Sequence, residues 1–430
     1  MKLSIKNVGK LKEADVEING ITVIAGENNT GKSTVGKVLW SIFSSFYKIN
    51  EQIAIEKQES IEKVIFNSFL DSMYQDNMGY LDPFYNEEKE KENIKKVSKK
   101  IVNTFENIKD DTELKYYLIN TLNKIIYSDV NASNYKIDEI VKILRITNDR
   151  IGEIAILKRL LKEFNNQINN IYSEAEAEME LIIKDKSLKI VIEDNKIKDL
   201  REDIYVNTEV FYIDDPHIVD ELEEISMEKI KFSHRGQLIE KLLNVEKESV
   251  INELLAEDRW EKINDKLNDI IQGNFTRKKN GRSFFYEEKN GYEEINVKNL
   301  SMGLKVFTII KLLIQNNSLK ENGTIILDEP EIHLHPEWQL KFAELIVLLQ
   351  KEFGMHILLT THSPYFVSAI EVFSEKYKVD DKCKYYMAEN NGNSSVIRDI
   401  TGNTREIYKK MARPLQDLEN IRYDSDFDEE

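Results

Sequence analysis

The chain has 430 residues, a formal net charge of −17 at pH 7 and a single cysteine, Cys383. One cysteine excludes an intramolecular disulfide and a cysteine-rich zinc hook, and the acidic balance disfavours broad non-specific binding to nucleic acid. No apolar run approaches the ~20 residues that cross a bilayer, so we expect a cytoplasmic protein with no membrane partner.

Residues 1–46 contain a complete phosphate-binding loop. A short apolar strand, 21–25, leads into a G-x-x-x-x-G-K-S sequence, and an amphipathic helix follows. Inward-facing backbone N–H groups and the helix start suit phosphates, Lys32 suits the β- and γ-phosphates, and the Ser33 hydroxyl suits Mg²⁺. The loop therefore predicts a nucleoside triphosphate site. Its expected binding residues are Gly26, Asn28, Asn29, Thr30, Gly31, Lys32, Ser33 and Thr34.

Residues 47–183 predict a helical insertion. This segment is rich in Glu, Lys, Asn and Ile, and apolar residues recur at helical spacing between Ile154 and Ile171. A sustained heptad is missing, so a helical lobe is favoured over a long coiled coil. Charge runs such as 87–92 are typical of solvated helix faces.

Residues 184–272 predict a return to strands and then to helix. Strands are expected at 188–192 and 209–213 within a β segment, 184–216, and a helical segment at 217–272. A hairpin around Lys289-Asn290-Gly291 should follow at 283–297. The basic groups Arg277-Lys278-Lys279 with Arg282, and 95–100, leave a contact with nucleic acid open.

Residues 273–400 contain three further elements whose side chains are suited to binding or catalysis. Ser301 and Gly303 open a helix, and a hydroxyl and an N–H at a helix start suit a γ-phosphate. The buried-strand run 324–328 ends in Asp328-Glu329, and the strand 356–361 ends at His362. Ser301 precedes Asp328 by 27 positions, and His362 follows it by 34. One helix and one strand fill each gap, which predicts a mixed α/β core.

Residues 401–430 form a C-terminal segment with an acidic tail. A hairpin around 390–393 precedes it. The run Asp424–Glu430 contains D-x-D motifs of the kind found in the metal sites of nucleases, but no strand–helix scaffold follows them. We expect a mobile tail and no nuclease activity in this chain.

The order of these motifs resembles that of the ABC-type ATPases: P-loop, signature Ser/Gly, Asp-Glu strand and switch histidine. The runs 328–337 and 359–364 look like the bacterial soluble branch that includes the OLD-family ATPases and the ATPase subunits of the Septu, PARIS and retron antiphage systems. This resemblance implies an α/β fold, an ABC-type P-loop head whose mixed sheet has an antiparallel β lobe, with a large helical insertion.

The same resemblance implies roles for individual residues. Lys32 would hold phosphate, Ser33 and Asp328 would support Mg²⁺, Glu329 would polarise the attacking water and His362 would contact the γ-phosphate. Ser301 and Gly303 would act in trans on ATP bound by a second subunit, so at least a homodimer is expected. Lys305 stands where many relatives have Gln or another polar residue.

Two functions remain open. One is an ATPase subunit that regulates a separate effector, a nuclease or toxin, in antiphage defence. The other is a DNA-engaging ATPase resembling RecF or the structural-maintenance-of-chromosomes proteins; a transporter motor fits poorly. His333 and His335 could form a metal pair, but a loop that faces the partner subunit is the preferred interpretation.

Overall fold

A computed structural model describes most of the chain. The described residues are 1–75, 87–125, 135–204, 206–222, 232–244, 260, 262–277, 284–288, 294–411, 413, 417–418 and 420–422. They divide into two compact units: Met1–Tyr47 with Ala155–Glu430, and Lys48–Ile154. Among these residues, no helix combines the length and the apolarity that a membrane span needs.

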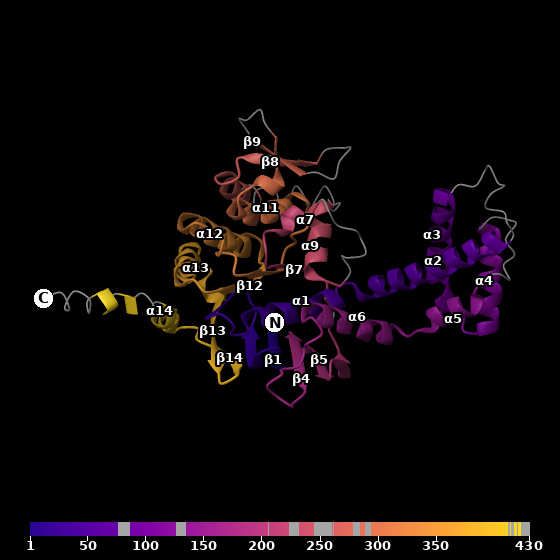
Figure 1. The fold of residues 1–430 in the computed structure, drawn as a ribbon, viewed down its shortest axis with the longest axis horizontal. Helices are drawn as coiled ribbons and strands as arrows, with labels where there is room; N and C mark the ends of the chain where they lie inside the picture. Colours follow the sequence, from indigo (N-terminus) through magenta and orange to yellow (C-terminus); the bar gives the residue numbers. More distant parts are fainter. Residues whose placement is uncertain are drawn as a thin grey trace. The chain divides into compact units, whose positions relative to one another are not determined.

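The first unit is built on one eleven-stranded sheet (Figure 1). Its antiparallel part is, in order, β6 (Lys196–Glu202), β5 (Lys186–Glu193), β4 (Ala177–Ile183), β1 (Lys2–Val8) and β2 (Leu11–Glu17). The sheet continues with β14 (Ser394–Asp399), β13 (Cys383–Asn391), β3 (Ile21–Gly26), β12 (His356–Thr361), β11 (Thr324–Asp328) and β7 (Val210–Ile213).

The strands from β13 to β7 run parallel, which places their carboxyl ends at one edge. All six residues of β3 are buried, as expected for a parallel strand covered on both faces. The register pairs Ala25 with Thr361 and Asp328 with Thr360. Position 26 requires glycine, because a Cβ there would lie 2.5 Å from the Ala388 carbonyl oxygen. The loops after β3, β11 and β12 therefore begin side by side.

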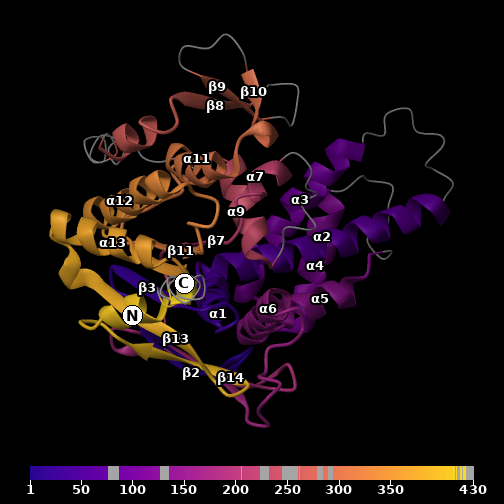
Figure 2. The same ribbon diagram turned by 60° about the vertical axis from the view of Figure 1, so that its left-hand side comes forward.

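Helices cover both faces of this parallel part. α1 (Lys32–Phe46) packs Gly36 against Ile326 and Tyr212. The alternate residues Ile325 and Leu327 face the other core, with α11 (Met302–Gln315), α12 (Pro336–Phe353) and α13 (Pro364–Tyr377). Figure 2 shows α12 and α13 side by side, where the rings of Phe342 and Phe366 stack at 6.4 Å.

Shorter elements complete the first unit. α9 (His234–Leu243) packs against the edge strand β7, near α7 (Ile218–Glu221). A separate antiparallel sheet contains β8 (Gly273–Arg277), β9 (Phe284–Glu288) and β10 (Glu294–Asn296). α14 (Arg405–Met411) follows the last strand and contacts α13.

In its described residues the second unit consists of helices and the short turns that join them. It contains α2 (Ile49–Gln75), α3 (Glu87–Thr104), α4 (Asp111–Ile125) and α5 (Ile137–Arg145). α6 (Asn148–Glu163) begins in this unit and ends in the first. A core of its own, including Ile65, Ile101 and Leu118, holds the helices together.

The predicted α/β fold class, a mixed sheet with an antiparallel part and a large helical insertion, is confirmed. Within the described residues, two of the predicted limits differ from the structure. The proposed insertion ran to 183, but 177–183 is strand β4, paired with β1. The proposed helical pattern ran to Ile171, but α6 ends at Glu163 because Asn165 and Asn166 adopt left-handed φ values of 49° and 62°. The turn at 289–293, the basic residues 278–283 and the tail 423–430 lie outside the described residues.

Candidate active site

The loop between β3 and α1 has the geometry of a phosphate cradle. Asn29 and Gly31 take left-handed φ values of 60° and 79°, which turn the backbone tightly before α1 begins at Lys32. The Thr30 hydroxyl closes the loop by donating to the Glu27 carbonyl at 2.8 Å. The first turn of α1 carries no acidic residue, so its free N–H groups and helix dipole favour an anion.

Lys32 is buried at the centre of this loop, with 3% of its side chain exposed. Its Nζ donates to the carbonyl oxygens of Gly26 (3.2 Å) and Glu27 (2.8 Å) and lies 3.5 Å from Glu329 Oε1. Burial lowers the pKa of Lys32, and Glu329 opposes that shift. The lysine is thus surrounded by oxygen acceptors where the loop curls.

Asp328 leaves β11 directly opposite the start of α1. Its Oδ1 accepts hydrogen bonds from Ser33 Oγ, at 3.1 Å, and from Thr360 Oγ1. Its Oδ2 accepts from the Tyr212 hydroxyl at 2.8 Å. A hydroxyl and a carboxylate next to a phosphate cradle are hard oxygen donors of the kind that Mg²⁺ prefers, so the residues fit the predicted magnesium site.

Glu329 and His362 form an ion pair that also involves Lys32. Glu329 Oε1 lies 2.5 Å from His362 Nε2, while His362 Nδ1 donates to the Gly26 carbonyl at 3.0 Å. Burial alone would raise the pKa of Glu329, but His362 and Lys32 lower it, so the carboxylate is charged at neutral pH. The hydrogen bond with Glu329 in turn raises the pKa of His362.

The backbone at Glu329 is held in an uncommon conformation. Its φ is +53°, in the left-handed region that a non-glycine residue rarely adopts. The Glu329 N–H donates to both the carbonyl oxygen and the hydroxyl of Thr360, each at 3.1 Å. Such strain persists where surrounding contacts over-determine it, and here those contacts direct the carboxylate toward Lys32.

Glu331 holds the backbone of His362 in place. Its Oε1 accepts hydrogen bonds from the Thr361 hydroxyl at 2.5 Å and from the His362 N–H at 3.0 Å. Burial raises the pKa of this carboxyl group. No role for Glu331 was expected, although it belongs to the 328–337 run that carries the family resemblance.

Ser301 and Gly303 are not part of this cluster. Ser301 caps α11, its exposed hydroxyl accepting a 3.4 Å hydrogen bond from the Leu304 N–H. Among the described residues, no hydrogen bond joins Ser301 to the P-loop. A Cβ on Gly303 would lie 3.1 Å from both the His333 carbonyl oxygen and the Trp338 ring, so the helix start packs tightly on the 330–335 loop. Lys305 is buried and pairs with Asp220 at 2.7 Å.

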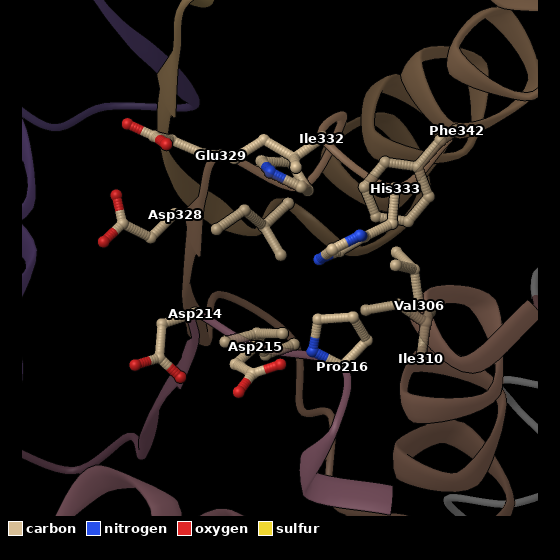
Figure 3. Close-up of a pocket in the computed structure, with 13 residues that line it drawn as sticks. Asp214, Asp215, Pro216, Val306, Ile310, Asp328, Glu329, Ile332, His333 and Phe342 are labelled. Carbon is tan, nitrogen blue, oxygen red and sulfur yellow. The ribbon is translucent and has the colours of Figure 1, made fainter. Parts of the chain in front are cut away.

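A small pocket lies between Asp328-Glu329 and α11 (Figure 3). It has a volume of about 40 Å³ and is lined by Val306, Ile310 and Phe342 on its apolar side. Asp214 lies below Asp328, and both carboxylates are on the side opposite Val306 and Ile310. Those carboxylates therefore belong to the edge of the sheet, away from the apolar lining.

The two histidines of the 330–335 loop have different surroundings. His335 caps α12, with Nδ1 accepting from the Glu337 N–H at 3.4 Å, and His333 lines the pocket. No group of three or more metal-ligating side chains occurs anywhere in the described ranges. The loop also exposes 59% of the apolar Ile332 side chain.

The structure thus brings together Lys32, Ser33, Asp328, Glu329 and His362 as the sequence predicted, and leaves the signature residues apart from them. Three supporting residues were not anticipated: Tyr212, Thr360 and Glu331. Tyr212 and Thr360 sit in apolar strands, and only the pairing of β7, β11 and β12 makes them neighbours of Asp328.

Comparison with known proteins identifies the family of this chain. Residues 1–367 match the AAA ATPase domain family. The chain belongs to that family. It is an ATPase domain protein, and the family implies ATP binding. Similarity to specific relatives is confined to short stretches.

Two curated proteins are similar to parts of this ATPase. The Retron Vc95 probable ATPase of Vibrio cholerae serotype O1 biovar El Tor is 32% identical over 108 residues, which are 23% of this chain and 20% of that protein. Septu protein PtuA of Bacillus thuringiensis is 45% identical over 51 residues, 12% of each chain. The alignments therefore span about a fifth and about an eighth of these relatives. The predicted resemblance to retron and Septu ATPases is confirmed.

Solved structures of SMC heads are similar over most of the chain. The SMC head domain from Thermotoga maritima aligns with a TM-score of 0.38 at 10% identity, covering 93% of this chain and 98% of that one. The Pyrococcus furiosus Smc head with an extended coiled coil, bound to the C-terminal domain of ScpA, aligns with a TM-score of 0.40 at 11% identity, covering 98% of both chains.

A buried charged cluster lies next to Tyr212, on the side of His234. His234, at the start of α9, is 7% exposed; its Nδ1 lies 2.7 Å from Glu163 Oε2 and its Nε2 lies 3.0 Å from Asp214 Oδ2. Burial disfavours the charged ring, but the two carboxylates outweigh it and raise the pKa of His234 to about 9. Arg235 lies next to the cluster, 3.6 Å from Asp214.

This cluster predicts that the stability of the ATPase depends on pH. Because the pKa of His234 rises from 6.5 to about 9 on folding, its contribution is fully present below about pH 6.5 and disappears as the pH rises through 9. The difference corresponds to about 3 kcal/mol. Denaturant unfolding at pH 6 and pH 9.5 should show this loss in the wild type and little of it in His234→Gln. Equal pH dependence in both proteins would contradict the assignment.

Proposed function

We propose that this chain binds and hydrolyses ATP with Mg²⁺ at the interface of two copies, and that this cycle regulates a separate effector in an antiphage system. The observation that carries the proposal is the convergence of Lys32, Ser33–Asp328 and Glu329–His362 at one sheet edge. A phosphate cradle, an oxygen pair suited to a metal and a charged carboxylate are the parts that phosphoryl transfer to water requires.

Each residue has a distinct task in this proposal. Lys32 exchanges its contacts with the Gly26 and Glu27 carbonyls for the β- and γ-phosphates of ATP. Ser33 and Asp328 hold Mg²⁺, which neutralises charge on the phosphates when bound. Glu329, charged and released from Lys32, accepts a hydrogen bond from the attacking water and aligns it. His362 donates to the γ-phosphate, while Glu331 holds its backbone in place.

The placement of Ser301 supports a site shared between two copies. Its hydroxyl is exposed at the start of α11, and no hydrogen bond within the described chain connects it to the P-loop. The adjoining loop exposes Ile332, and Gly303 packs against that loop, so both belong to one surface. A polar helix start next to an exposed apolar side chain suits the surface of a second copy.

Mixing two inactive variants tests this arrangement. We expect Lys32→Ala and Ser301→Arg each to lose ATP turnover, and their mixture to regain part of it. A mixed dimer contains one complete site, formed by the P-loop of the Ser301→Arg chain and the signature of the other. Phosphate release measures the outcome, with the exposed Ser187→Arg as a control for the added arginine. Wild-type turnover by Ser301→Arg alone would contradict the proposal.

The regulatory part of the proposal rests on the relatives. Short stretches are similar to a retron ATPase and to Septu PtuA, whose names place them in such systems. We expect the tagged chain to co-purify with the product of a neighbouring gene, a nuclease or toxin, and the Glu329→Gln variant to change the activity of that product. An effector that acts identically with and without the ATPase would argue against regulation.

A DNA-engaging ATPase is the second candidate. The observation in its favour is a group of exposed lysines on α3 in the helical unit: Lys95, Lys96, Lys99 and Lys100. The net charge of −17 opposes it. We would then expect the protein to bind duplex DNA, with an affinity that falls steeply with salt and is lost when these lysines are replaced by glutamine. That result would favour the DNA-engaging ATPase over the ATPase that regulates an effector.

A further inference from the structure

Tyr212 is the one aromatic residue that donates a hydrogen bond to Asp328 among the described residues. It lies in β7, paired through Ile326 with β11, and its hydroxyl reaches Asp328 Oδ2 at 2.8 Å. Burial, the nearby carboxylates and this hydrogen bond raise the pKa of Tyr212 well above its ordinary value, so the hydroxyl remains a donor. Ser33 and Thr360 both donate to the other oxygen, so within the described ranges Tyr212 is the hydrogen-bond donor that holds Oδ2.

The Tyr212 ring is itself fixed by His234. The two ring centroids lie 4.5 Å apart at 33°, and Trp40 of α1 meets His234 edge-on at 5.9 Å. The imidazole stands between two carboxylates from different elements, Glu163 at the end of α6 and Asp214 just after β7. A charged imidazolium over an aromatic face is attracted to it, which orients both rings.

We propose that His234 is a positioning residue of the magnesium site. His234 holds Asp214 and the Tyr212 ring, so that the Tyr212 hydroxyl fixes Asp328. Through Glu163, His234 also connects the Asp328 carboxylate to the end of α6. This inference rests on the proposed ATPase function and adds to it a structural connection. Among the described residues, no hydrogen bond or ion pair joins His234 to Asp328 or to the P-loop, and the ring of Tyr212 lies between His234 and Asp328.

The connection ends at the last turn of α6. α6 begins in the helical unit and ends at Glu163, whose carboxylate accepts from both the His234 N–H, at 3.1 Å, and its ring. Nearby, the Trp40 Nε1–H of α1 donates to Gln237 Oε1 of α9 at 2.7 Å. A shift of the last turn of α6 would therefore move His234, Tyr212 and Asp328 together.

The test compares ATP binding with and without magnesium. We expect Tyr212→Phe and His234→Gln to raise the Mg²⁺ concentration for half-maximal binding of MgATP by about 10-fold or more, as is usual when the partner of a metal-supporting carboxylate is removed. Their affinity for ATP in EDTA should match the wild type, because the phosphate cradle is untouched. Calorimetry with ATP at stepped Mg²⁺ concentrations measures both quantities.

Matched controls separate positioning from general damage. Tyr386→Phe removes another buried hydroxyl, which accepts from the Glu17 N–H at 2.9 Å, and His356→Gln replaces a histidine at the opposite end of β12. Both controls should keep the wild-type Mg²⁺ dependence. A Glu163→Gln/His234→Gln double variant should shift it no further than His234→Gln alone, since both act through one connection.

Two outcomes overturn the inference: an unchanged Mg²⁺ dependence in Tyr212→Phe and His234→Gln, or fully additive effects of the Glu163 and His234 substitutions. Neither would affect the proposed function, provided that the wild type still binds MgATP. Absence of ATP binding by the wild-type protein, in contrast, would remove the proposed function together with the inference.

Discussion

Lys32→Ala is expected to abolish ATP turnover and to weaken ATP binding. Lys32 is the buried cation of the loop, and its Nζ already stands among oxygen acceptors where phosphates would lie. Loss of one preorganised electrostatic contact to the reacting group typically costs about 10²- to 10³-fold in rate. The substitution also leaves Glu329 without a cation at 3.5 Å. Phosphate release and calorimetry with ATP measure the two effects.

The control for this prediction lies on the same helix. Lys37→Ala removes the next lysine of α1, which is outside the phosphate loop, and should retain wild-type binding and turnover. Circular dichroism should show that both variants keep their fold. Binding of ATP by Lys32→Ala with wild-type affinity would mean that the loop does not hold the triphosphate as proposed.

Glu329→Gln is expected to separate ATP binding from hydrolysis. The substitution keeps the size of the side chain and removes the charge that His362 and Lys32 stabilise. A positioned base contributes about 10²- to 10⁴-fold to proton-transfer steps, so turnover should fall by that order. ATP should still bind, because the cradle and Asp328 remain. The uncleaved nucleotide should then hold two chains together.

Light scattering after size exclusion with ATP and Mg²⁺ measures the dimer, and phosphate release measures turnover. The exposed Glu375→Gln on α13 is the matched control and should behave as the wild type in both assays. Normal turnover by purified Glu329→Gln would refute the role of this carboxylate. A monomer with tightly bound ATP would instead retain the catalytic role and refute the shared interface.

Local sequence was sufficient for most of the parallel core. The strands that end at Gly26, Asp328 and Thr361 are continuous apolar runs, and such runs are typical of strands buried on both faces. The sequence motifs and their spacing then identified the phosphate loop, the two carboxylates and the histidine. The end of the helical insertion was harder to predict from the sequence. The apolar spacing continued past Glu163, while two asparagines with positive φ ended the helix.

By itself, the sequence determined which side chains could carry the chemistry of this protein. Only the tertiary structure decided their neighbours, because the order of strands in a sheet follows from packing and not from order along the chain. β3 lies between β12 and β13, and β11 between β12 and β7, so Tyr212, Thr360 and Glu331 come to support Asp328 and His362. The same packing leaves Ser301 exposed, since the start of α11 rests on the 330–335 loop and not on the chain's own phosphate cradle.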